Sequence, residues 1–148
     1  MAYRTVTQRC ATIVQDEVPV GVAVKPGHMI DIYNVAGVKK VLPHGIAGGN
    51  ASPMFACENE FEGKDIADAY VAGEHCIVRT FRSGDLVAAR VVTGQTLVFG
   101  TKLESAGTGC LTTYGTDTPS AGEVDAWVAS AEEVVTTTTE TLVLVRIR

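Results

Sequence analysis

The stretch "HCIVRTFRSGDLVAARVVTGQTLVFG", His75 to Gly100, decides the fold class. It contains three short apolar runs rich in β-branched residues, and the turn sequences "RSGD" and "VTGQ" separate them. Short apolar runs bounded by Gly, Asp and Ser indicate β-strands. The same pattern occurs upstream in "HMIDIYNV" and downstream in "VDAWVAS" and "TLVLVRIR". Strands and turns at this spacing predict a mainly β protein, either a barrel or a sandwich.

Two segments depart from this pattern. "GKDIADAYVAG", residues 63–73, places Ile66, Ala69 and Tyr70 on one helical face and ends at a glycine, which predicts one short amphipathic helix. Pro19 and Pro26 indicate that the first 25 residues are extended rather than part of the barrel. We therefore divide the chain into an extended N-terminal arm, residues 1–25, and a β-barrel-like body, residues 26–148.

The C-terminal end predicts a strand that must be paired on both sides. "ETLVLVRIR", residues 140–148, is so apolar that an open edge there would promote aggregation, so we expect it inside the barrel or against another subunit. Trp127, on the preceding strand, is expected to pack in the core. The threonine-rich segment 134–141 between these strands predicts a loop or a hairpin tip.

Composition excludes several classes of protein. The chain has 148 residues, the length of one domain, and a net charge of −5. Residues 49–148 carry seven basic and fourteen acidic residues, which argues against a nucleic-acid partner. No apolar run approaches the ~20 residues that cross a bilayer, and the first fifteen residues lack the apolar core of a signal peptide. We expect a soluble protein made in a cytoplasm, without a membrane partner.

The chemical motifs in the sequence are incomplete. Asp65 stands where a phosphate-binding loop needs Ser or Thr. Glu58, Glu60, Glu62 and Gly63 imitate a calcium loop, but Ala69 stands where the bidentate glutamate belongs. The four cysteines, Cys10, Cys57, Cys76 and Cys110, lack the close spacing of zinc ligands. The three histidines, His28, His44 and His75, lie on separate turns or strands. His75 and Cys76 are adjacent, so their side chains point to opposite faces of a strand, which is poor geometry for a thiolate–imidazole pair. We therefore expect no catalytic, cofactor-binding or metal-binding residues and no enzyme activity, although a site assembled from distant residues stays open.

Four groups of residues resemble a known family. They are Pro26-Gly27, the AGGN-x-x-PMFA-x-E pattern of residues 47–58, the GK-x-I-x-DAY-x-AG pattern of residues 63–73, and the L-x-SAG-x-G-x-L pattern of residues 103–111. Together with the final "LVRIR", these patterns resemble the head decoration, or capsid cement, proteins of tailed bacteriophages. The resemblance extends over about residues 24–111 and the last strand, and its motifs consist of turn and packing residues.

The resemblance implies a structural virion protein and no cofactor. It implies a β-barrel or β-tulip-like body, usually a homotrimer, bound to the major capsid protein on the outside of the head and stabilising the shell. The family provides no catalytic residue to carry over, and we transfer no capsid-contacting residue. Two alternatives stay open: a small β-barrel enzyme or ligand-binding protein with a pocket in the barrel mouth, and a phage tail or baseplate component.

Overall fold

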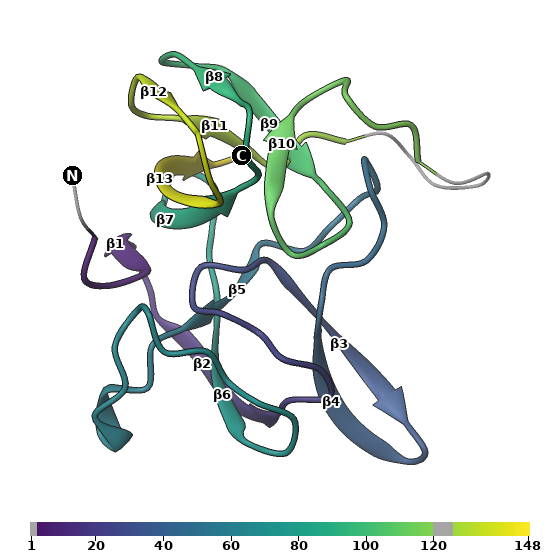
Figure 1. The fold of residues 1–148 in the computed structure, drawn as a ribbon. Helices are drawn as coiled ribbons and strands as arrows, with labels where there is room; N and C mark the ends of the chain where they lie inside the picture. Colours follow the sequence, from purple (N-terminus) through teal and green to yellow (C-terminus); the bar gives the residue numbers. More distant parts are fainter. Residues whose placement is uncertain (1–2, 120–125) are drawn as a thin grey trace.

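The computed structural model describes residues 3–119 and 126–148, and its architecture is mainly β, as the sequence predicts. Five strands form a closed barrel in the upper half of the molecule (Figure 1). Their order around the barrel is β7 (Leu86–Val91), β10 (Leu111–Thr113), β9 (Lys102–Ser105), β11 (Ala129–Ala131) and β13 (Thr141–Ile147). The pairing of β13 with β7 closes the ring, so the predicted barrel is confirmed.

The C-terminal strand has a partner on each side. β13 runs antiparallel to β7 from Thr141 opposite Val91 to Arg146 opposite Leu86, and it runs antiparallel to β11 on its other edge. This confirms that the apolar terminal run pairs inside the barrel. The threonine-rich segment before it contains β12 (Val135–Thr136), which pairs with β8 (Thr96–Leu97), and then a turn into β13. The segment thus contains the predicted turn before the last strand, but its short strand pairs with the distant β8 instead of forming a hairpin with β13.

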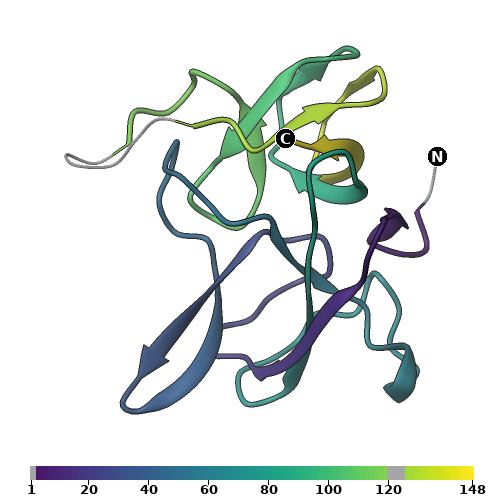
Figure 2. The same cartoon turned by 180° about the vertical axis from the view of Figure 1, so that it is seen from behind.

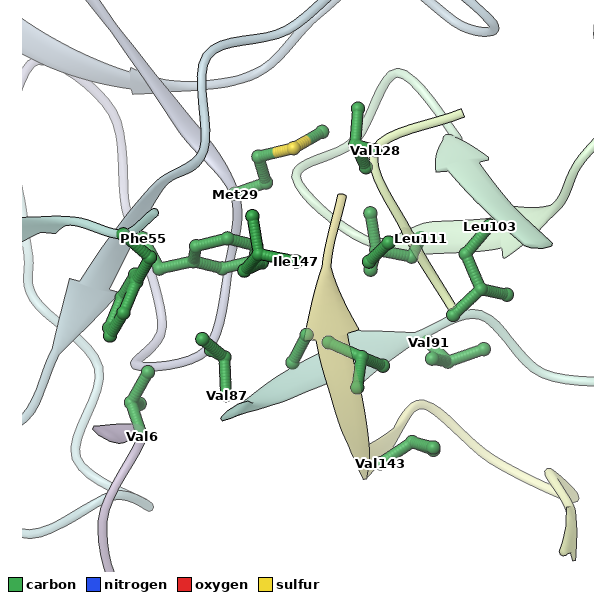
Figure 3. Packing of buried hydrophobic residues seen from close by; sticks show 14 of the residues in the cluster. Val6, Met29, Phe55, Val87, Val91, Leu103, Leu111, Val128, Val143 and Ile147 are labelled. Carbon is green, nitrogen blue, oxygen red and sulfur yellow. The ribbon is translucent and has the colours of Figure 1, made fainter. Parts of the chain in front are cut away.

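Alternating side chains fill the barrel. Every second residue of β7 and of β13 is enclosed, among them Val87, Ala89 and Val91 on the first strand and Val143 and Val145 on the second (Figure 3). This period of two follows from strand geometry, because successive side chains point to opposite faces of the sheet. The interior is thus a packed core of Val, Leu, Ile and Ala.

The N-terminal half of the chain builds the lower part of the molecule (Figures 1 and 2). One three-stranded sheet has the order β2 (Val14–Pro19), β6 (His75–Thr80) and β5 (Met54–Cys57). A separate hairpin consists of β3 (Ile30–Val35) and β4 (Val38–Pro43), and it extends away from the body. A backbone bridge between Val20 and Val41 joins the base of this hairpin to the chain after β2.

The sheet of β5 and β6 lies between two hydrophobic clusters. Phe55 and Ile77 project into the cluster that includes the barrel interior, and Phe55 meets Phe81 edge to face with ring centroids 5.8 Å apart. Ala56 and Val78, one residue further along each strand, project into a second cluster with Val20, Val41 and Tyr70. Because successive side chains of these strands serve opposite clusters, the sheet connects the barrel to the hairpin layer.

The predicted N-terminal arm contributes two strands that pair with the body. β1 (Thr7–Arg9) lies antiparallel to β7, and β2 lies antiparallel to β6. Val6 is fully buried, and its backbone N–H donates to the Glu58 carboxylate at 2.9 Å. The segment is extended as predicted, but its backbone hydrogen bonds and its buried valine make it part of the packed structure.

The helix predicted for residues 63–73 is not formed. The described residues contain only a 3-10 helix, η1 (Glu60–Glu62), followed by turns. The Asp65 carboxylate accepts the Ala67 N–H and the Asp68 carboxylate accepts the Asp65 N–H, as in a capping box at the start of a helix, but the chain continues only as a turn. Tyr70 instead pairs through its backbone with Val24. In the described part of the chain, no helix has the length and apolar character of a membrane span.

The prediction that Trp127 packs in the core is wrong. Trp127 precedes β11 and is only half-buried. Its ring lies between two cations, with Lys102 Nζ 5.1 Å and the Arg148 guanidinium carbon 4.7 Å from the ring centroid. The aromatic face is therefore used for cation–π contacts at one end of the barrel.

Candidate functional site

A buried histidine and a buried cysteine meet a partly exposed glutamate from a distant part of the sequence. His28 lies in the loop before β3, Cys110 lies immediately before β10, and Glu140 lies in the turn before β13. One potential ligand atom from each lies within 4.8 Å of the others. Their positions in the chain are far apart, so no spacing motif could have identified them.

Cations and donors surround the Glu140 carboxylate. Its Oε1 atom lies 3.1 Å from Arg90 Nη1, 3.4 Å from Lys25 Nζ and 3.5 Å from His28 Nε2. The backbone N–H of Lys25 donates to His28 Nδ1 at 3.1 Å, so the neutral imidazole carries its proton on Nε2, toward the carboxylate. Burial lowers the pKa of His28 to about 4, and the charges of Arg90 and Lys25 act in the same direction, against that of Glu140.

This geometry suits a structural role better than metal binding or nucleophilic catalysis. A zinc ligand needs a free imidazole lone pair, but Nδ1 accepts a hydrogen bond and Nε2 holds the proton. The carboxylate is already neutralised by Arg90 and Lys25. Burial raises the pKa of the Cys110 thiol to about 12, and its side chain is enclosed, so it is a poor nucleophile. The cluster ties together the loops before β3, β10 and β13.

A second buried cluster has the composition of a Ser-His-Asp triad. Ser105 Oγ lies 2.6 Å from His44 Nδ1, and His44 Nε2 lies 3.6 Å from Asp31 Oδ2. Such a triad attacks substrates through an accessible serine hydroxyl. Ser105 is fully buried, and its Oγ also accepts the Gly107 N–H at 3.1 Å. A substrate cannot reach this hydroxyl, so the three side chains stabilise the packing of two loops.

Glycines allow these two loops to approach closely. Gly48 donates its N–H to the Ser105 carbonyl at 2.8 Å, and Gly109 donates to the His44 carbonyl at 3.1 Å. A Cβ atom on Gly107, which has a φ of 77°, would lie 3.0 Å from the Ala47 nitrogen. Residues 44–50, "HGIAGGN", therefore form a tightly packed corner, because larger residues would separate the backbones.

The acidic run does not converge on an ion. Glu58 is buried and accepts the Val6 N–H, whereas Glu60 and Glu62 lie exposed on η1. Lys64 pairs with Glu74 at 2.7 Å. The three acids that imitate a calcium loop therefore do not share a site, because Glu58 points inward and Glu60 and Glu62 face solvent.

The accessible surface differs in character from these enclosed clusters. The hairpin carries an open hollow of about 310 Å³, lined by Ile32, Tyr33, Asn34, Gly37 and Lys39. Large apolar side chains with more than half of their surface exposed occur in the turns, connecting segments and 3-10 helix of the described chain; they are Ile13, Val22, Phe61, Val71, Val98, Phe99 and Val134. Single exposed apolar side chains are ordinary on a protein surface, so adjacent pairs such as Ile13 with Val14 and Val98 with Phe99 are the stronger candidates for contact with another macromolecule.

Comparison with known proteins adds no relative. No protein-family model matches the chain, and a search of curated proteins finds no match. The function is therefore argued from the residues and their geometry.

Proposed function

We propose that this protein is a structural virion protein that binds the outside of a bacteriophage capsid and stabilises the shell. One observation carries the proposal: in the described chain, the potential nucleophiles and bases of both clusters are buried, while adjacent apolar side chains at a strand edge face solvent; the buried residues are His28, His44, Ser105 and Cys110. That distribution favours binding to a protein surface over chemistry on a small substrate. The packed barrel interior also disfavours a ligand pocket in the barrel mouth.

The motifs that resemble decoration proteins support this assignment, since they hold the fold together. Gly48 and Gly107 form the close corner described above. Glu58 binds the backbone of the N-terminal segment. The Tyr70 hydroxyl donates to the Cys57 carbonyl at 2.6 Å. Proteins with the same fold need the same residues at such tightly packed positions. The packing roles of these motif residues therefore support the resemblance.

The outer edge of β2 is the surface that we assign to the shell. β2 is the outermost strand of its sheet, and its residues 14–17 are all exposed. Ile13 and Val14 are 61% and 45% exposed and add apolar contact area at this edge. An extended segment of the major capsid protein can pair with such an edge as an additional strand. Several copies on one shell, such as the homotrimers that the resemblance implies, would add avidity.

Sedimentation with undecorated phage heads tests this proposal. We expect the full-length protein to pellet with heads, and the Ile13→Lys/Val14→Lys variant to bind at least tenfold more weakly, because charge at a strand edge opposes pairing. Val98→Lys, at an equally exposed site in the turn after β8, is the matched control and should bind normally. Failure of the wild-type protein to bind heads would refute the proposal, and binding to isolated tails instead would favour a tail component.

A further inference from the structure

The free part of the β3–β4 hairpin has one apolar face. Tyr33 lies opposite Lys40 in the antiparallel register, and Val35 lies opposite Val38. Directly opposed residues share a face, and so do residues two apart along a strand, so these four side chains belong to one face. Asn34 and Lys39, which lie opposite each other, belong to the other face.

This apolar face has no partner within the described chain. Tyr33, Val35 and Val38 are 38%, 40% and 49% exposed. Lys40 has no carboxylate within ion-pair distance among the described residues, whereas Lys39, on the opposite face, lies 4.0 Å from Asp16. Asp31, two residues before Tyr33, shares this face at the base of the hairpin, where its carboxylate accepts the Tyr33 hydroxyl at 3.2 Å and lies 3.6 Å from His44 Nε2. The free part of the face therefore combines three large side chains with one unpaired positive charge.

An exposed aromatic side chain that complements this hairpin face projects from another part of the molecule. Phe61, in the 3-10 helix η1, is 86% exposed, the largest exposure among the large apolar residues described. Glu60 and Glu62 flank it, and neither forms an ion pair with a described residue. An exposed aromatic side chain between two negative charges matches an apolar face that carries a lysine.

The two surfaces lie on opposite flanks of the lower half of the molecule. The hairpin extends to one side, and the coiled ribbon of η1 lies on the other in both views (Figures 1 and 2). They therefore cannot meet within one chain. Contacts between different patches on opposite flanks join molecules head to tail, and such contacts form a closed ring when the rotation between copies permits.

We infer that the chain associates head to tail with a second copy of itself: Phe61 of one copy packs on the hairpin face of Tyr33, Val35 and Val38 in the next. Glu60 and Glu62 then lie near Lys40 of that neighbour. Burying the phenyl ring removes the largest exposed apolar side chain from water, and the charges fix the direction of the contact. This contact does not depend on shell binding, because it uses the hairpin and η1 rather than the edge of β2.

Sedimentation velocity across the micromolar range tests the contact. The wild-type protein should form an oligomer that high salt weakens, since salt screens the exposed charges. Phe61→Ser should weaken association on the order of 30-fold, as expected for loss of an aromatic anchor. Phe99→Ser is the matched control: Phe99 is 68% exposed at the turn after β8, outside the contact, so its loss should leave the association unchanged.

Charge reversal tests the orientation of the contact. Lys40→Glu alone and Glu60→Lys/Glu62→Lys alone should each disrupt the oligomer, and all three changes in one chain should restore it. Lys39→Glu makes the same charge change on the other face and should have a smaller effect. Circular dichroism checks that each variant is folded. A monomeric wild-type protein, an unaffected Phe61→Ser variant or failure of the combined reversal to restore association would overturn the inference.

Discussion

The buried imidazole of His28 makes the stability of the fold depend on pH. The loop before β3 buries the imidazole beside Glu140, Arg90 and Lys25, and burial lowers its pKa from about 6.5 to about 4. Between these values the unfolded chain binds a proton that the folded chain does not, so stability is lost as the pH falls through this window. The difference of about 2.5 pKa units corresponds to about 3 kcal/mol.

We expect His28→Asn to remove this part of the pH dependence. The asparagine oxygen can accept the Lys25 N–H in place of Nδ1, but the side chain does not titrate. Urea unfolding at pH 7 and pH 4.5 should show a larger loss of stability for the wild-type protein than for the variant. His75→Asn, at an exposed position on β6, is the control and should retain the wild-type dependence. Equal losses for His28→Asn and the wild-type protein would contradict the assignment.

The sequence could not have identified either buried cluster at the residue scale. The spacing of the histidines and cysteines along the chain matches no metal or nucleophile motif. The contacts of His28 with Glu140 and of His44 with Ser105 arise only when the barrel closes and brings distant loops together. Turn glycines were easier to interpret, since their conformational freedom is a local property.

Strands were predicted better than the helix at the scale of elements. Alternating apolar runs predicted β6, β7 and β13, because burial on one face of a sheet imposes a period of two. Residues 63–73 also have a helical period, and Asp65 and Asp68 form the bonds of a helix start, but Tyr70 pairs through its backbone with Val24. Tertiary backbone pairing therefore outweighed the amphipathic pattern.

The N-terminal strand should be required for stability. Removal of residues 1–9 would delete the fully buried Val6 side chain and leave the buried Glu58 carboxylate without the Val6 N–H. The Ala88 N–H would also lose the Val6 carbonyl, which accepts it at 2.8 Å. We expect a loss of at least about 3 kcal/mol of unfolding free energy, measured by urea denaturation.

Two full-length variants distinguish the effect of lost side-chain packing from the effect of shortening the chain. Val6→Ala should lose roughly 2 kcal/mol through the cavity alone. Thr7→Ser keeps the hydroxyl that accepts the Arg79 guanidinium at 2.7 Å, and it should be close to neutral. A truncated protein as stable as the full-length chain would show that β1 is a dispensable arm.

The two hydrophobic clusters should unfold together at the scale of the whole molecule. β5 and β6 supply Phe55 and Ile77 to the barrel cluster, and Ala56 and Val78 to the cluster beneath the hairpin. Neither cluster can lose this sheet without exposing one of its faces. We therefore expect one cooperative transition, as is usual for single domains of this size.

The single tryptophan makes this prediction measurable, because Trp127 lies at one end of the barrel between Lys102 and Arg148. Val143→Ala removes a buried side chain from the barrel, and Val20→Ala removes one from the second cluster. Both should lower the urea midpoint of Trp127 fluorescence, each by the equivalent of roughly 2 kcal/mol. If Val20→Ala left that midpoint unchanged while far-ultraviolet circular dichroism showed an earlier transition, the hairpin layer would unfold independently of the barrel. If fluorescence and circular dichroism instead showed the same shift, the two clusters would unfold as one unit. The β5–β6 sheet would then couple them, since Val20 belongs to the cluster on the far side of that sheet from the barrel.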